Sequence, residues 1–383
     1  MEKLTKISEL RANTPAAVEG EVFRTSEARG AFVYFVRDET GGVEMITGGE
    51  FAPRGVITAS GKVRERDGAL QLVASEAGVI DKARAARLSE EIKKSIDARA
   101  QPLESKLMIE DEVTRKIELQ LREAARVVRE AVLTARPILL RHHGDADGIA
   151  GALALAAGIA ALLREEKFSA EMRYSLFRAH QTPSAIYEKE DALRDINTLR
   201  IVGGKPLVIL LDFGANEESR DALEVLKGAE FETIITDHHP TRLDARKFAS
   251  HYISPWNFEG GSSDYTAGFL ACELAKKIGI VDARDQFATK SQMVHFSRSE
   301  KLEIGLLEKA SLIGDKSKLL RADDADEKEK KCALVLDFLG AHKKFEHTLE
   351  FYEKVLGNER LFNSLHSQAT ERIEQAKKLA KES

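Results

Sequence analysis

Hydrophobic and polar positions divide the chain into stretches with different periods. Residues 16–75 hold short runs rich in β-branched and aromatic residues, separated by glycine-containing turns such as Glu-Thr-Gly-Gly and Arg-Asp-Gly. Runs of this length and composition between turn signals are typical of strands. Five such strands fit into the segment. We therefore predict a small five-stranded β-barrel within residues 1–80.

The next stretch, residues 81–134, has the pattern of helices. Its first part is charged and rich in alanine, and Pro102 interrupts it. Apolar residues then recur at three- and four-residue steps from Ile109 to Val128, which predicts an amphipathic helix. We interpret this stretch as a helical connector.

From Pro137 onward, strand-like and helical patterns alternate. This alternation predicts βαβ units and a doubly wound, mostly parallel α/β domain over residues 135–320. Residues 321–383 begin with a charge run and end in a helix, which we interpret as C-terminal helices. The strands are predicted at 137–143, 171–178, 206–214 and 231–239.

Composition and charge limit the possible partners and cellular compartment of the protein. The net charge is −5, so any nucleic-acid site is a local patch and not a property of the whole surface. The two cysteines, Cys272 and Cys332, are far apart in sequence, which favours a reducing, cytoplasmic compartment. The apolar run 149–163 is shorter than a bilayer span requires, so we expect a buried helix and no membrane partner.

Acidic and histidine residues gather where the predicted strands end. Asp145 and Asp147 follow the first strand, Asp212 ends a second, and Asp237 begins an Asp-His-His triplet after a third. The carboxyl ends of parallel strands meet at one edge of a sheet, where ligands bind. Carboxylates placed together repel one another, so a cation must lie among them. Histidine and aspartate without thiolates favour Mn²⁺ or Mg²⁺, and the excess of ligands favours two ions.

Four short motifs, in order, resemble those of the DHH phosphoesterases. They are HGDADG (143–148), LLDFG (210–214), TDHHP (236–240) and LIGDKS (312–317). The stretch GGSSDYTAG (260–268) also resembles the turn between the third and fourth motifs of the RecJ-like single-strand nucleases of archaeal type. The resemblance covers roughly residues 135–320.

That resemblance implies a two-ion ligand set, with Mn²⁺ as the first choice and Mg²⁺ as the second. One ion would be held by a histidine and an aspartate of the first motif, the other by the second aspartate of that motif with ligands from the third and fourth. Asp212 would bridge both ions. The implied ligands are His143, Asp145, Asp147, Asp212, His238 and Asp315.

Further roles follow from the same resemblance. His239 would face the scissile phosphate, and Asp237 would orient an imidazole. Motif spacing selects His143 as the ligand, and strand alternation would turn His142 to the other face. Ser262 and Ser263 are interpreted as helix-start residues that cap the helix or donate to a phosphate.

The predicted barrel resembles an OB-fold, a fold that commonly binds single strands. Phe32 and Tyr34 share one face of a strand and would offer stacking rings if that face is outward. Residues 1–80 contain ten Lys and Arg against twelve Asp and Glu, so the segment is not basic overall. A protein-binding barrel is therefore the alternative. The basic residues expected to accompany the rings are Arg24, Lys62 and Arg64.

Three functions remain open from the sequence. The first is a metal-dependent phosphodiesterase or exonuclease, acting on single-stranded DNA or RNA through a metal-activated water, in repair, replication or RNA turnover. The second is a non-catalytic scaffold among replication or repair proteins. The third is a small-substrate enzyme acting on short oligonucleotides, cyclic dinucleotides or pyrophosphate. The resemblance also implies a second lobe with a glycine-rich motif ending in histidine, which this sequence lacks, so we expect a fragment or a short form. The sequence is silent on oligomeric state.

Overall fold

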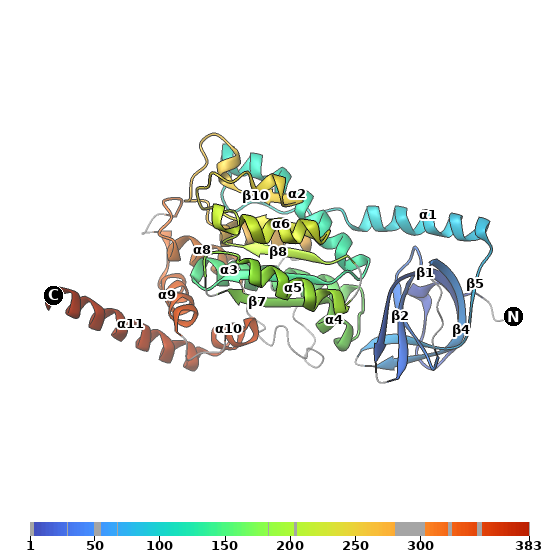
Figure 1. Ribbon diagram of the computed structural model, residues 1–383. Helices are drawn as coiled ribbons and strands as arrows, with labels where there is room; N and C mark the ends of the chain where they lie inside the picture. Colours follow the sequence, from blue (N-terminus) through green and yellow to red (C-terminus); the bar gives the residue numbers. More distant parts are fainter. Residues whose placement is uncertain are drawn as a thin grey trace.

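The computed structural model describes residues 4–28, 30–49, 55–66, 68–182, 184–202, 205–279, 303–320, 324–342 and 347–382. The described chain forms a β-barrel at one end, a five-stranded parallel sheet flanked by helices in the middle, and a helical extension at the other end (Figure 1).

The barrel is closed, with strand order β1-β2-β3-β5-β4. Inward residues of every strand, such as Val18, Met45 and Leu72, fill its core. Along β2, Tyr34 and Val36 point into this core, whereas Phe35 packs with residues of the central sheet region. The strands are β1 (Pro15–Ala28), β2 (Ala31–Arg37), β3 (Gly42–Thr47), β4 (Gly55–Arg66) and β5 (Ala69–Val79), preceded by a short 3-10 turn η1 (Ile7–Glu9).

Two helices connect the barrel to the sheet. The first, α1 (Lys82–Arg99), begins at Asp81, whose carboxylate accepts from the backbone N–H groups of its first turn. The second, α2 (Glu112–Leu133), begins with a capping box between Asp111 and Thr114 and buries one apolar stripe. The apolar residues of α2 join the largest core of the molecule, so the connector is part of the packed structure.

The central sheet has the order β10-β9-β8-β6-β7, and every pair of neighbours is parallel. From β6 the chain goes to β7 on one side and then to β8 on the other, so the order reverses between β6 and β8. In such sheets the crevice at this reversal, outside the carboxyl ends of the strands, is the usual ligand site. The strands are β6 (Ile138–His143), β7 (Phe177–Thr182), β8 (Leu207–Leu211), β9 (Glu232–Thr236) and β10 (His251–Ile253).

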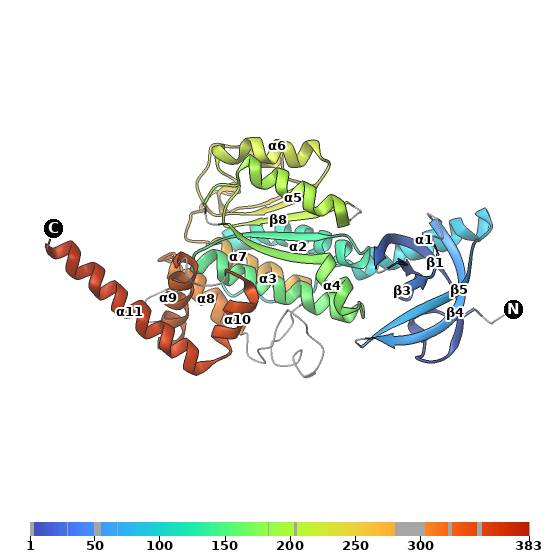
Figure 2. The ribbon, with the colours of Figure 1, turned by 60° about the horizontal axis from the view of Figure 1, so that its bottom comes forward.

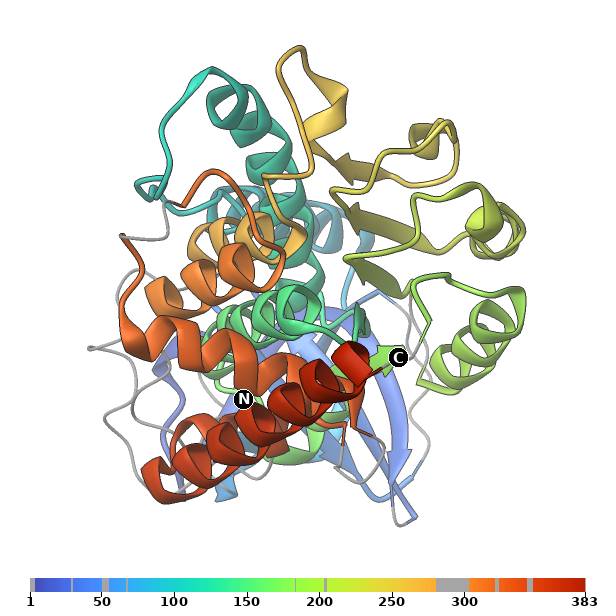
Figure 3. The same cartoon turned by 90° about the vertical axis from the view of Figure 1, so that its left-hand side faces the viewer.

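Helices cover both faces of the sheet (Figure 3). Alternate strand residues divide between two cores, as Leu140 faces α3 and α7 while Leu139 faces α5 and α6. The predicted α/β fold class with an N-terminal barrel is therefore confirmed. The helices are α3 (Ala146–Glu165), α4 (Ala170–Leu176), α5 (Lys189–Val202), α6 (Arg220–Gly228), α7 (Ala267–Ile278) and α8 (Ile304–Gly314), with 3-10 turns η2 (Glu217–Ser219), η3 (Ala245–Lys247) and η4 (Pro255–Asn257).

The apolar run expected to be a buried helix is α3. This helix is long and apolar enough to cross a membrane, yet 94% of its apolar window is buried inside the protein. It packs between the sheet and α7, where small residues allow close approach. A Cβ on Gly151 would lie 2.7 Å from Gly268 Cα, so glycine is required at this crossing. The helix has the surroundings of a core element.

One predicted strand was partly wrong. The stretch 171–178 was expected to be extended, but α4 ends at Leu176 and β7 begins only at Phe177. Ser169 caps α4 by accepting from Met172 N, and this local cap outweighs the apolar alternation.

The barrel is fixed to the central region by buried charges and aromatic rings. Arg37 on β2 forms an ion pair with Glu166, and both side chains are fully buried. Arg99 at the end of α1 pairs with the same carboxylate. Beside this network the rings of Phe35 and Phe168 lie 4.9 Å apart. The outward face of β2 is therefore covered.

The C-terminal helices pack against α3 and α8 and then leave the body. The last helix extends away from the side opposite the barrel (Figure 2). These helices are α9 (Glu327–Ala341), α10 (Leu349–Leu356) and α11 (Glu359–Glu382).

Candidate metal centre

The end of β6 delivers three candidate ligands within five residues. His143 is the last residue of the strand, Asp145 is the N-cap of α3, and Asp147 lies in its first turn. Asp145 accepts from Gly148 N at 2.9 Å, which starts the helix. A Cβ on Gly148 would lie 2.5 Å from His143 O, so only glycine fits this tight strand-to-helix turn. The turn thus places all three side chains at the carboxyl edge of the sheet.

Asp147 is almost completely buried, and its carboxylate joins three parts of the chain. It accepts from Ala267 N at 3.0 Å and from Gly268 N at 2.9 Å, at the start of α7. Ser311 Oγ on α8 donates to the same carboxylate. These bonds fix the orientation of Asp147 before any ion binds.

Asp212, directly after β8, lies at the centre of the cluster. Its φ is +64°, in the left-handed region that aspartate tolerates better than most residues but that still costs about 1–3 kcal/mol. The side chain is 1% exposed, and its Oδ1 atom has only a loose contact with an imidazole, 3.3 Å from His238 Nε2. Its Oδ2 atom lies 3.5 Å from His143 Nδ1. A strained backbone and an unsatisfied buried oxygen together mark a functional position.

The third motif, after β9, supplies an oriented imidazole. His238 Nδ1 donates to Ser263 O at 2.7 Å, which directs Nε2 at the carboxylates. Nε2 then lies 3.3 Å from Asp212 Oδ1 and 3.3 Å from Asp315 Oδ2. Asp147 Oδ2 is 3.6 Å away.

Asp237 faces away from the centre and holds the neighbouring residue. It accepts from Ala215 N at 3.1 Å and from His239 N at 3.1 Å. It also lies 2.8 Å from His239 Nδ1. The ring of His239 is half-exposed, so this carboxylate orients an imidazole that faces solvent.

The six predicted ligands fall into two separate groups, and a third group of Asp212, His238 and His239 links them. His143, Asp145 and Asp212 bring ligand atoms within 4.8 Å of one another. Asp147, His238 and Asp315 do the same, and the bonds of His238 link this group to Asp212. The two groups contain the same residues that the motifs assign to two ions, and that assignment stays a prediction.

Burial and mutual repulsion shape the charges of the cluster. Burial raises the pKa of Asp147 well above its usual value, and the charge of Asp212 adds to the effect. Burial also raises the pKa of Asp212, with Asp145 as its main repulsive neighbour. The carboxylates outweigh the burial penalty at the histidines, raising the pKa of His143 to about 10 and that of His238 to about 11. In the metal-free protein the imidazoles therefore serve as counter-cations.

These donors fit divalent ions. The groups offer carboxylate oxygens and imidazole nitrogens without a thiolate, the donor set of Mn²⁺ and Mg²⁺. The unsatisfied Oδ1 of Asp212 lies between the two groups, where a bridging ligand is needed. No Lys or Arg forms an ion pair with these carboxylates within the described ranges, so a cation from solution would supply the missing charge.

The comparisons with known proteins agree with this geometry. Residues 137–294 match the family described as "DHH family, N-terminal domain". This part of the chain, which contains the central sheet, is therefore similar to the DHH family. The candidate ligands of the first three motifs lie inside the matched range, and Asp315 lies beyond it.

Individual relatives are similar over the same part of the chain. An uncharacterized protein of Methanocaldococcus jannaschii is 28% identical over 235 residues, which is 58% of this chain and 31% of the relative. This chain thus corresponds to less than a third of that relative. A solved DHH-domain structure, described as a member of a family of ribosomal proteins, is similar with a TM-score of 0.64 and 25% identity, covering 77% of this chain and 70% of the other. The structure of exonuclease RecJ bound to manganese is similar with a TM-score of 0.41 and 17% identity, covering 69% of each chain.

The two adjacent histidines of the first motif have different positions. His143 belongs to one of the two groups, whereas His142 is 1% exposed and lies with Nδ1 2.8 Å from His143 O. Burial lowers the pKa of His142 to about 4, so it stays neutral in the core. His142 therefore lies in the core, on the opposite side of the strand from His143, as strand alternation predicts.

The serines between the third and fourth motifs were misplaced by sequence reasoning. Helix α7 is capped by Thr266, which accepts from Phe269 N, so neither Ser262 nor Ser263 begins the helix. Ser263 Oγ donates to His238 O at 2.9 Å, and Ser262 Oγ lies 3.1 Å from Asp264 Oδ2. Both hydroxyls therefore stabilise the loop that supports the DHH motif.

A carboxylate from α9 was missed altogether. Asp337 Oδ1 accepts from Ala146 N at 2.6 Å, between the two aspartates of the first motif. Burial and the charges of Asp145 and Asp315 raise the pKa of Asp337 to about 6. The same helix approaches the motif at Gly340, where a Cβ would lie 1.9 Å from Gly144 O. Nearly 200 residues separate the partners, so no local sequence signal could have indicated the contact.

The predicted nucleic-acid residues of the barrel need correction. Tyr34 is 1% exposed inside the barrel, and Phe32 packs partly against the same core, so their shared face points inward. Arg24 is buried and directed at the DHH domain, where its Nη1 donates to Ala135 O at 3.4 Å. Closure of the barrel decides which face of β2 is inside, and alternation alone leaves both choices open. Lys62 and Arg64 are exposed, as expected.

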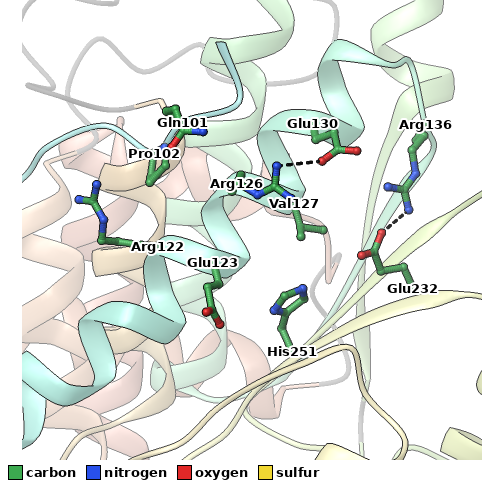
Figure 4. Close-up of a pocket in the computed structure, with 10 residues that line it drawn as sticks. All are labelled: Gln101, Pro102, Arg122, Glu123, Arg126, Val127, Glu130, Arg136, Glu232 and His251. Atoms are coloured by element: carbon green, nitrogen blue, oxygen red, sulfur yellow. Dashed lines mark hydrogen bonds and ion pairs between the residues drawn. The ribbon is translucent and has the colours of Figure 1, made fainter. Parts of the chain in front are cut away.

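A pocket of about 590 Å³ lies at the opposite end of the sheet, where the strands begin (Figure 4). Arg136 precedes β6, while Glu232 and His251 are the first residues of β9 and β10. Arg136 pairs with Glu232 at 2.6 Å across this pocket. It is lined by none of the candidate metal ligands, which lie at the carboxyl edge of the sheet.

Proposed function

We propose that this protein is a two-metal phosphodiesterase that hydrolyses single-stranded DNA or RNA. One observation carries the proposal. Two groups of carboxylates and imidazoles lie next to each other where the strand order reverses, and they are joined by the buried Asp212 of one group and His238 of the other, 3.3 Å apart. The match of residues 137–294 to the DHH family supports phosphoesterase chemistry as the general class.

Each proposed role follows from a contact. His143 and Asp145 would hold one ion, Asp147, His238 and Asp315 the other, and Asp212 would bridge them. Two bound divalent ions supply an activated water and stabilise negative charge on the phosphate oxygens.

The remaining step concerns the phosphate itself. The bond from His239 Nδ1 to Asp237 raises the pKa of His239 and leaves Nε2 free to donate to a phosphate oxygen. The half-exposed ring faces a substrate at the cluster. Asp237 would thereby keep His239 in its donating state.

Manganese is proposed first and magnesium second, because both prefer oxygen and imidazole donors. Both cysteines are free and buried, which favours a reducing cytoplasm. The barrel and the exposed Lys62 and Arg64 support a single strand as substrate. Replication and repair proteins are the proposed partners.

The domain boundaries proposed from sequence are 1–80, 81–134, 135–320 and 321–383. The barrel strands end at Val79, and the connecting helix α2 ends at Leu133. Both ends lie close to the proposed limits.

A second candidate function is supported by the covered face of the barrel. Strands β2 and β3 commonly contribute the oligonucleotide face in folds of this kind. Here Arg37 on β2 pairs with Glu166, and Glu44 on β3 accepts from Ser169 N at 3.0 Å. A barrel occupied in this way favours short oligonucleotides over long polymers as substrate.

One experiment separates these functions. The full chain is incubated with Mn²⁺ and end-labelled single strands of 3 or 30 nucleotides, beside the Asp212→Asn variant. Asparagine tolerates the left-handed backbone at this position, so the fold is kept while the bridging charge is lost. We expect cleavage by the wild type and a loss on the order of 10³-fold in the variant.

The matched control is Asp221→Asn, an exposed aspartate on α6 that should leave activity unchanged. Cleavage of the short strand alone would select the second function. If the wild type binds Mn²⁺ and hydrolyses neither strand with any divalent ion, the enzymatic proposal is wrong and a scaffold role remains.

A further inference from the structure

The chain contains a single tryptophan, and it lies beside the DHH motif. Trp256 is in the turn η4, three residues after the last residue of β10. Ser254 caps this turn by accepting from Trp256 N, and Pro255 occupies its first position. The backbone under the side chain is therefore well defined, although the residue is 45% exposed.

The indole is bonded to a candidate metal ligand. Trp256 Nε1 donates to the backbone oxygen of His238 at 2.8 Å. The same oxygen accepts from Ser263 Oγ at 2.9 Å. His238 in turn places its imidazole between Asp212 and Asp315. The aromatic ring is thus tethered to the metal cluster through one residue.

This arrangement differs from an ordinary exposed side chain. An isolated apolar residue on a surface is common and needs no explanation. An indole whose N–H is already bonded has lost part of its rotational freedom, so a ligand that packs on the ring pays less entropy. The ring is large, flat and partly open, and its N–H is bonded to His238, whose own ring centroid lies 4.6 Å from that of the solvent-facing His239.

We propose that Trp256 is a stacking platform for a nucleobase next to the phosphate held at the metal cluster. The inference rests on the proposed function, because it assumes a nucleotide chain as substrate. Every base has a π-face, so stacking on an indole binds single strands without strong sequence preference. The site would compensate for the covered β2 face by supplying base contacts within the DHH domain itself.

A single tryptophan makes the proposal directly measurable. Intrinsic fluorescence of the full-length Asp212→Asn protein reports on this ring alone. Titration with an oligothymidylate should quench the emission as the base stacks. A series of such strands, each with one abasic nucleotide at a different position, is then tested. Quenching should disappear for the strand whose abasic position is the one that stacks on Trp256. Anisotropy of a labelled strand measures binding in parallel.

Kinetics on the otherwise wild-type protein give the second readout. Trp256→Ala should raise KM by roughly 5- to 150-fold, the equivalent of about 1–3 kcal/mol per stacked base. The value of kcat should change much less, because the metal ligands remain. Trp256→Phe keeps a stacking ring without the N–H and should lie between the two. On the abasic strand, wild type and Trp256→Ala should have equal KM values.

The control is Tyr174→Ala, an exposed aromatic on α4 that is 55% exposed and should leave KM unchanged. Unchanged KM in Trp256→Ala, or strand binding without a change in emission, would overturn the stacking role. Failure of the proposed function gives a different result. In that case no strand is cleaved. Quenching by the intact strand that disappears when one nucleotide is abasic would still support the stacking site. Absence of any strand binding would overturn both.

Discussion

The two ends of the central sheet balance charge in opposite ways. At the amino end, around the pocket in Figure 4, glutamates face arginines, as in the pairs Arg136–Glu232 and Arg126–Glu130. At the carboxyl end, within the described ranges, the ion pairs of the four aspartates of the cluster are all with imidazoles. At the amino end the positive and negative side chains balance each other, whereas the carboxyl end has more negative than positive groups. The difference shows which end of the sheet is built to take up cations.

If the carboxyl end lacks positive charge, the largest change in the free energy of unfolding should come from adding a divalent ion. Mn²⁺ at 100 times its dissociation constant should raise the free energy of unfolding of the wild type by about 2.7 kcal/mol. In EDTA, Asp212→Asn should be more stable than the wild type by about 1–4 kcal/mol, because one like charge is removed from the cluster.

Chemical denaturation with EDTA or Mn²⁺ measures both values. Addition of Mn²⁺ should shift the difference in stability toward the wild type by up to about 2.7 kcal/mol. A variant that is less stable in EDTA, or that gains as much from Mn²⁺ as the wild type, would contradict the charge imbalance.

The next effect concerns the carboxylate from α9. Asp337 accepts from Ala146 N and adds negative charge near Asp145 and Asp315. Asp337→Ala should weaken Mn²⁺ binding by about 10- to 100-fold, the usual cost of losing a residue that orients metal ligands.

Calorimetric titration with Mn²⁺ tests this expectation. Asp337→Asn keeps the acceptor for Ala146 N and loses the charge, so it separates the two contributions. Equal affinity in Asp337→Ala and wild type would show that α9 only packs against the motif.

At the amino end, breaking a pair should have a small effect. Arg136 and Glu232 are partly exposed, with 18% and 29% of their side chains accessible. Glu232→Gln should change the free energy of unfolding by less than about 1 kcal/mol, as is usual for such pairs. Mn²⁺ affinity should stay the same. A change in Mn²⁺ affinity would mean that the two ends of the sheet are coupled.

The smallest expected effect is a pH dependence of the free energy of unfolding, caused by His251 at the amino end of the sheet. Burial lowers the pKa of His251 below its usual 6.5. The folded state therefore binds this proton less readily than the unfolded state, and its contribution to stability is lost as pH falls below 6.5.

Unfolding measured between pH 7.5 and 5 in EDTA tests the sign. His251→Gln should flatten this dependence. A steeper slope in the variant would show that His251 is stabilised by protonation.

The sequence predicted the sheet, and it predicted that the candidate ligands lie together at one edge, because both follow from local patterns. Strand runs that end in Asp145, Asp212 and Asp237 require the carboxylates to meet once the strands are parallel. The roles assigned to them stay predictions until an ion is bound. The spacing of the motifs also predicted Asp315 as a ligand. This residue follows the last turn of α8 and lies beside His238 in the cluster.

What the sequence did not predict depends on contacts between distant segments. Asp337 reaches the first motif across nearly two hundred residues, and Trp256 meets His238 only because η4 folds back after β10. Tyr34 was assigned to a possible outer face because alternation defines two faces without saying which is inside. Arg24 was expected to bind a strand, but docking of the barrel buries it.

The buried ion pair between barrel and DHH domain also sets an order of events during synthesis. Arg37 and Glu166 are 129 residues apart. At 5–20 residues per second, a ribosome needs roughly 6 to 26 seconds to produce the partner of Arg37 after Arg37 itself. The barrel strands are complete well before that time. The newborn barrel must therefore remain soluble with Phe35 and Arg37 uncovered, until α3 has been made and the two can dock.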